Sequence, residues 1–95
     1  MQESNQTWDA AIIGGGVAGI AAAVALARSN YRVILLEKRP LLGGRASSWI
    51  EHKTGMRLDA CQHGTMRCCT NLTQLLEWIG TADKIRWQEV INFVD

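Results

Sequence analysis

The sequence lacks a charge excess of either sign. Ten lysines and arginines oppose nine aspartates and glutamates in 95 residues, which leaves a formal net charge of +1. Binding to nucleic acid relies on a basic surface, so this balance argues against a nucleic-acid partner. Hydrophobic residues make up 47% of the chain and charged residues 20%, which is typical of a globular domain rather than a disordered segment.

Cysteine pairs at metal-binding spacing are also missing. Cys61, Cys68 and Cys69 form no C-x-x-C motif, and adjacent cysteines chelate one ion poorly, so we predict no metal site. The segment before residue 10 contains Glu3 and Asp9 but no lysine or arginine, so the basic region of a secretory signal is absent. An odd number of cysteines without a signal indicates reduced thiols and predicts a cytoplasmic location.

The sequence does contain a glycine-rich turn between an apolar run and an alanine-rich run. Gly14, Gly16 and Gly19 have the G-x-G-x-x-G spacing, with a strand predicted before them at residues 10–13 and a helix after them at residues 17–29. In this motif the first glycine permits a sharp turn, and the second lets a pyrophosphate approach the backbone. The third lets the helix pack closely on the strand.

Residues around the predicted helix complete a dinucleotide site. The N–H groups of the first helical turn, at Val17 and Ala18, have no intrahelical partner, and the helix dipole favours a diphosphate there. The apolar run at residues 32–36 predicts a second, parallel strand. Glu37 ends this run at about the separation from Gly14 expected of a carboxylate that binds an adenosine ribose, and the adjacent Lys38 is included in the predicted site. Strand, helix and strand predict a right-handed βαβ unit of an α/β, Rossmann-like domain.

The same stretch has an alternative interpretation as a membrane segment. Residues 10–27 contain no charged side chain, and their number is near the lower limit for a membrane span. Three consecutive glycines in the middle disfavour a helix, and the flank lacks the basic residues of a signal anchor. We therefore predict no transmembrane segment.

A second glycine pair follows the predicted βαβ unit. Pro40 bars continuation into a helix, and Gly43 and Gly44 permit another close approach of the backbone. Arg45 beside them is a planar cation suited to phosphate, although a solvated arginine in an ordinary loop explains the pattern equally well.

The remainder of the chain predicts a hairpin and a helix. Short strands are expected at residues 46–51 and 56–59, and a helix at residues 72–79 with Asn71 as its N-cap. The loose alternation of residues 87–94 indicates the start of a further strand.

The combination of the glycine turn with Gly43-Gly44-Arg45 resembles the FAD-dependent amine oxidases, phytoene desaturases and their relatives. The resemblance implies that the glycines of the first motif lie under the FAD pyrophosphate and that Glu37 binds the adenosine ribose. It also implies that Gly44 and Arg45 reach the phosphates and the ribityl side. A nicotinamide-dependent dehydrogenase would leave the second glycine motif unexplained, so FAD is the expected cofactor.

A narrower similarity concerns residues 59–63 and 68–72, which are similar to those of the hydroxysqualene dehydroxylases. This similarity implies an FAD-dependent removal of the hydroxyl group of hydroxysqualene in squalene biosynthesis, with an apolar terpenoid substrate and peripheral contact with a membrane. A carotenoid (phytoene) desaturase or an amine oxidase of the same superfamily is the alternative enzyme. A non-catalytic dinucleotide-binding fragment is the alternative without activity.

The length of the chain limits what it can do alone. Proteins of this superfamily are several times longer, so residues 1–95 are expected to be the N-terminal portion of a flavin-binding domain, without the substrate domain. We expect the isolated chain to be inactive, and we assign no catalytic residue.

Overall fold

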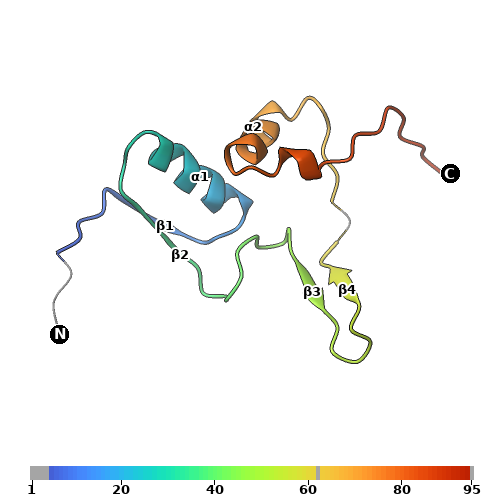
Figure 1. Cartoon of the computed structure of the whole chain (residues 1–95), viewed down its shortest axis with the longest axis horizontal. Coiled ribbons are helices and arrows are strands. Elements are labelled where there is room, and N and C mark those ends of the chain that lie inside the picture. Colours follow the sequence, from blue (N-terminus) through green and yellow to red (C-terminus); the bar gives the residue numbers. More distant parts are fainter. Residues whose placement is uncertain (1–4, 62, 95) are drawn as a thin grey trace. The chain divides into compact units, whose positions relative to one another are not determined.

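The computed structural model describes residues 5–61 and 63–94, which divide into two compact units, Met1–Gly64 and Thr65–Asp95 (Figure 1). The first unit contains two pairs of strands and one α-helix, and the second contains one α-helix and one 3-10 turn. In chain order the elements are β1 (Ala10–Ile13), α1 (Val17–Arg28), β2 (Val33–Leu36), β3 (Ser48–Ile50), β4 (Arg57–Asp59), α2 (Thr70–Trp78) and η1 (Ala82–Lys84).

The first unit begins with the predicted βαβ arrangement. Strands β1 and β2 are parallel and in register from the pair Ala10–Val33 to the pair Ile13–Leu36, and α1 packs against both strands (Figure 1). The α/β prediction, with a parallel pair of strands joined by a helix, is therefore confirmed. Asn30 adopts the left-handed conformation, with a φ of 66°, just after the helix, a conformation that commonly ends a helix at its C-terminus.

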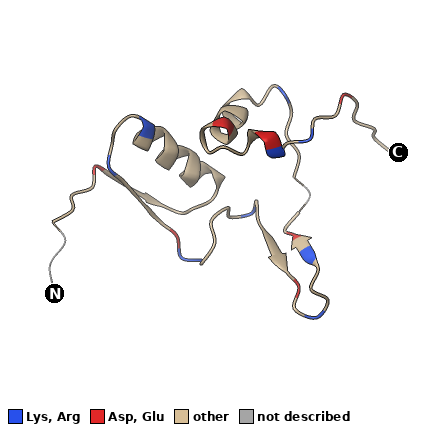
Figure 2. Cartoon of the chain, in the orientation of Figure 1, with Lys and Arg blue, Asp and Glu red and all other residues tan. Residues whose placement is uncertain are grey.

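The composition of α1 suits it to lie on a sheet. It consists of alanine, glycine and aliphatic residues, and Figure 2 shows no charge along it before Arg28 in its last turn. A cation at this end complements the helix dipole. Where β1 and β2 begin, the carboxylate of Asp9 accepts a hydrogen bond from the N–H of Arg32 at 2.7 Å, which aligns the two strands.

Strands β3 and β4 form the predicted hairpin, but β3 is shorter than expected at both ends and β4 begins one residue later than expected. They pair antiparallel from Ser48 with Asp59 to Ile50 with Arg57. The carboxylate of Glu51 organises the connecting turn, because it accepts hydrogen bonds from the N–H groups of Lys53 at 3.0 Å and Thr54 at 2.8 Å. The hydrogen bond that the hydroxyl of Thr54 donates to Glu51 is the largest cause of a lowered pKa of this carboxyl group, and the two backbone bonds lower the pKa further.

The second unit corrects one prediction about its helix. Helix α2 begins at Thr70, its N-cap is Cys69, and Asn71 lies inside the first turn rather than at the cap. The carbonyl of Cys69 already accepts hydrogen bonds from both the N–H and the hydroxyl of Thr73 at 3.2 Å, so the helical bonding starts two residues earlier than predicted.

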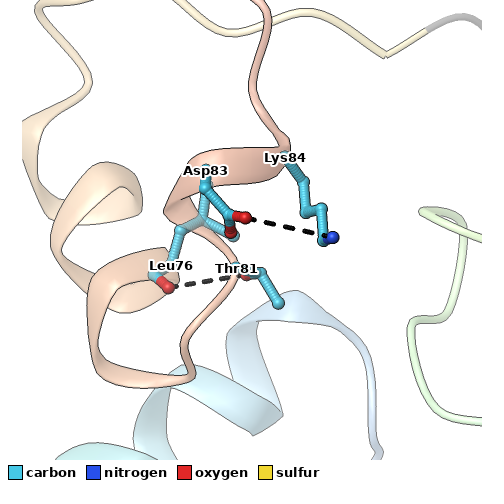
Figure 3. A network of polar contacts seen from close by, with 4 residues as sticks. All are labelled: Leu76, Thr81, Asp83 and Lys84. Carbon is cyan, nitrogen blue, oxygen red and sulfur yellow. Dashed lines mark hydrogen bonds and ion pairs between the residues drawn. The ribbon is translucent and has the colours of Figure 1, made fainter.

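A hydrogen bond joins the end of α2 to the residue before the short helix η1, and an ion pair lies within η1. The hydroxyl of Thr81 donates to the carbonyl of Leu76 at 3.5 Å, and Lys84 lies 3.9 Å from the carboxylate of Asp83 (Figure 3). Both members of the ion pair are exposed, so this pair contributes little to stability.

The predicted strand at residues 87–94 is wrong, because this part of the chain forms no regular element. A strand exists only where a neighbour completes its hydrogen bonds, and no described segment pairs with it. Val90 and Ile91 are 66% and 65% exposed.

Apolar side chains are poorly covered throughout the described residues. Leu75 is the only hydrophobic residue among them that is buried, with 6% exposure, whereas Ile13 of β1 is 83% exposed. Within residues 5–61 and 63–94, no helix is both long enough and apolar enough to cross a membrane.

Candidate dinucleotide-binding site

The candidate site is centred on the turn between β1 and α1. Gly14 leaves the strand with a φ of 101°, a conformation that favours glycine, while its N–H donates to the carbonyl of Leu36 at 2.8 Å. A Cβ atom on Gly19 would overlap the carbonyl oxygen of Gly14. The first turn of α1 therefore lies directly against the glycine turn.

Gly16 is the N-cap of α1 and leaves that end of the helix open. Its carbonyl accepts the first helical bond, from Ile20 at 2.9 Å, and it has no side chain to cap the helix. The N–H groups of Val17 and Ala18 consequently have no intrahelical partner, and no acidic residue lies in the first turn to compete with an anion.

The backbone beside Gly16 is not covered by other atoms. A Cβ on Gly16 would lie 4.0 Å from its nearest neighbour, the Cα of Gly44, so a side chain there would enter open space and not the protein. A phosphate in that space would lie beside the N-terminus of α1, where free N–H groups and the helix dipole bind anions.

The second glycine pair lies against the first. The N–H of Gly43 donates to the carbonyl of Gly15 at 2.8 Å, and Gly43 forms an isolated parallel bridge with Gly16. Gly44 has a φ of 59°, and a Cβ on it would lie only 3.1 Å from the Cα of Gly16. Two loops that are far apart in sequence thus form one backbone surface.

Glu37 joins the end of β2 to the same turn. One carboxylate oxygen, Oε2, accepts a hydrogen bond from the N–H of Gly15 at 2.5 Å, and Oε1 accepts one from the N–H of Arg39 at 3.3 Å. The hydrogen bond from Gly15 is the largest cause of a pKa of Glu37 below its ordinary value of 4.5, and the bond from Arg39 is the second largest. The positive charges of Arg39 and Lys38 lower the pKa further. The carboxylate is therefore ionised at neutral pH and keeps unused lone pairs for hydroxyl donors.

Gly15 is a site residue that the sequence did not identify. It is buried, and a Cβ on it would overlap the side chain of Leu42 and lie 3.2 Å from Oε2 of Glu37. Gly15 is the variable position between the first two glycines of the motif, so the motif spacing gives no reason to include it in the site. The unbroken run from Gly14 to Gly16 was the available hint.

Arg45 and Lys38 complete the predicted set but remain exposed. In the described part of the chain, no hydrogen bond or ion pair engages either side chain. Both follow directly from residues that contact the glycine turn, Gly44 and Glu37, so the backbone brings them to the edge of the site.

The cysteine and histidine residues form no comparable centre. The Sγ of Cys61 lies 3.5 Å from Nδ1 of His63, both side chains are exposed, and Gln62 between them lies outside the described residues. No group of three histidines, cysteines or acidic residues in the described ranges could hold a metal ion.

Comparison with known proteins places the segment that contains this site in a family. Residues 12–77 match the family model described as an NAD(P)-binding Rossmann-like domain. This segment contains both glycine motifs, Glu37 and most of α2.

Similar proteins are enzymes of carotenoid metabolism by name. A zeta-carotene desaturase of Synechocystis sp. is 35% identical over 79 residues, which are 83% of this chain and 16% of the relative. A carotenoid phi-ring synthase of Streptomyces griseus is 44% identical over 69 residues, 70% of this chain and 13% of the relative. A 15-cis-phytoene desaturase of Narcissus pseudonarcissus is 32% identical over 78 residues, 82% of this chain and 14% of the relative.

The chain thus spans no more than 16% of the length of these three relatives. The match to the family model, in contrast, covers most of the chain and includes every element of the candidate site. The chain belongs to the family of NAD(P)-binding Rossmann-like domains.

Proposed function

We propose that this chain is the N-terminal, FAD-binding portion of a longer oxidoreductase of the carotenoid desaturase type, with an apolar isoprenoid substrate. The names of the relatives support the substrate class, and the small fraction of their length that the chain spans supports the view that it is one portion of a larger protein.

The observation that carries the choice of FAD is the contact between the two glycine loops. Gly43 donates to Gly15, and Gly44 lies against Gly16, so the second loop extends the surface at the N-terminus of α1. A nicotinamide dinucleotide needs only the first loop and an acidic residue after β2. An extended surface suits a cofactor whose chain continues beyond the diphosphate into a ribityl group, with Arg45 at its edge.

The residues of this chain bind and orient the cofactor. The N–H groups of Gly16, Val17 and Ala18 hold the diphosphate, and the free lone pairs of Glu37 accept the ribose hydroxyls. Bound FAD would supply the hydride-transfer chemistry, as the group that takes up a hydride from the substrate in a desaturation. No residue described here is assigned to proton transfer.

The relatives do not support the narrower expectation of a hydroxysqualene dehydroxylase. The three named above are two carotenoid desaturases and a carotenoid ring synthase, which favours the carotenoid desaturase alternative. The residues behind the narrower similarity include Cys61 and His63, whose side chains are exposed and lie 3.5 Å apart.

The test is made on the full-length protein that carries this chain. We expect the purified protein to show the visible absorption of flavin and to release FAD on denaturation. Phytoene and zeta-carotene are offered with an electron acceptor, and hydroxysqualene is offered separately with a reductant. Desaturated carotenoid is the expected product. Release of NAD(P) in place of FAD, or formation of squalene alone, would overturn the proposal.

A further inference from the structure

The N–H groups of the glycine turn are divided between the protein and the open site. That of Gly14 donates to Leu36, and that of Gly15 donates to Oε2 of Glu37. The next groups along the chain, from Gly16 to Ala18, lie where α1 begins and have no intrahelical partner. The N–H of Gly15 is therefore the last one in the turn that is bound by another residue of the protein. The N–H groups that follow it are available to an anion.

Both polar groups of Gly15 are fixed by residues far away in sequence. Its N–H is bound by Glu37 and its carbonyl by the N–H of Gly43. Gly15 is buried, so an N–H left without a partner there would be costly. The carboxylate of Glu37 is itself held, because its other oxygen accepts the N–H of Arg39.

We propose that Glu37 is a positioning residue for the diphosphate site as well as a ribose ligand: by holding the Gly15 peptide, its carboxylate fixes the N–H groups that follow. The proposal rests on the proposed function only in taking a diphosphate as the ligand of this turn. It applies equally to FAD and to a nicotinamide dinucleotide.

Charge and geometry predict opposite effects of Glu37 on the binding of an anion. A carboxylate near a diphosphate repels it, so loss of the charge alone strengthens the binding of pyrophosphate. Loss of the hydrogen-bond acceptor frees the Gly15 peptide and weakens the same binding. If Glu37 were only a ribose ligand, loss of its hydrogen-bond acceptor would not weaken the binding of pyrophosphate.

Two variants with the same charge separate these effects. Glu37→Gln and Glu37→Ala both remove the carboxylate, but the glutamine keeps an amide oxygen that can accept the N–H of Gly15. The probe is inorganic pyrophosphate, which has no ribose, and the protein is the full-length protein stripped of its cofactor. Binding is measured by calorimetric titration.

We expect the alanine variant to bind pyrophosphate roughly three- to tenfold more weakly than the glutamine variant, the range set by one neutral hydrogen bond. Equal affinities of the two variants would overturn the positioning role. If FAD is absent from the purified protein but the two variants differ as expected, the cofactor assignment fails and the positioning role stands.

Amide hydrogen exchange at Gly15 gives a second readout without ligand. The wild-type and glutamine proteins should protect this amide from exchange, and protection in the alanine variant should fall by roughly three- to tenfold, the range expected for one hydrogen bond. If the alanine variant does not fold, the test is made by comparing the glutamine variant with the wild-type protein. Protection of Gly15 and pyrophosphate affinity no weaker than wild type are then expected, and loss of either overturns the proposal.

Discussion

The carbonyl oxygen of Gly14 occupies the space that a Cβ atom on Gly19 would need. These two glycines, one directly after β1 and the other in the first turn of α1, set how closely the helix approaches the turn. The obstacle is a backbone atom, which cannot move aside as the end of a flexible side chain can. The two positions therefore act as one packing unit.

Gly19→Ala should destabilise the fold itself. The added methyl group forces α1 away from the turn, and overpacking of this kind costs about 1–3 kcal/mol. The measurement is the free energy of unfolding in urea. Gly64→Ala is the matched control, because a Cβ there would meet no atom within 4 Å. Equal stability of the two variants would contradict the packing role of Gly19.

Gly16→Ala should leave the fold intact and weaken the cofactor. A Cβ at this position lies 4.0 Å from Gly44, an ordinary contact, but it enters the space assigned to the diphosphate. We expect a melting temperature close to wild type together with a roughly tenfold or greater loss of FAD affinity, the equivalent of about 1.4 kcal/mol. A variant with wild-type FAD affinity would show that the diphosphate lies elsewhere.

The sequence predicted the local features of this site and the distant residues that belong to it, but it missed the hydrogen bonds between them. The strand, turn and helix around Gly14 follow from apolar runs and glycine spacing, which are properties of neighbouring residues. The bond between Gly15 and Glu37 joins residues 22 positions apart, and no periodicity encodes it. The failure at residues 87–94 has a related cause, since the formation of a strand depends on a partner that the segment itself does not specify.

Gly44→Ala should disturb both the fold and the cofactor site. Gly44 has a φ of 59°, and an added Cβ would lie 3.1 Å from the backbone of Gly16. Gly80→Ala is the control, because Gly80 has a φ of 77° but open space around it, so only the left-handed conformation costs energy, about 1–2 kcal/mol. We expect Gly44→Ala to lose more stability than the control in urea unfolding, and to bind FAD more weakly. A smaller loss than in Gly80→Ala would count against contact between the loops.

The stability of the cofactor-free protein should depend on pH through Glu37. Its pKa is lower in the folded state than the ordinary 4.5, so the ionised carboxylate stabilises the fold at pH values above 4.5. This contribution is lost as the pH falls from about 5 through the lowered folded-state pKa. The wild-type free energy of unfolding should therefore fall more steeply over this range than that of Glu37→Gln.

The control for this experiment is Glu89→Gln, which removes the same formal charge at an exposed position. Its free energy of unfolding should follow the wild-type curve. Parallel curves for wild type and Glu37→Gln would mean that the bond from Gly15 to Glu37 does not stabilise the folded protein.

The 95 residues expressed alone should neither hold FAD stoichiometrically nor desaturate a carotenoid. Leu75 is the only buried hydrophobic residue described, while Ile13 is 83% and Leu36 46% exposed, so β1 and β2 lack the covering that parallel strands have in complete domains. Burial of apolar surface is the main source of stability, and net stabilities are only a few kcal/mol even for complete small domains. We expect a broad thermal transition, aggregation and loss of flavin on gel filtration, all reversed in the full-length protein. A monomer that melts cooperatively, retains one FAD and converts phytoene would show that these residues suffice.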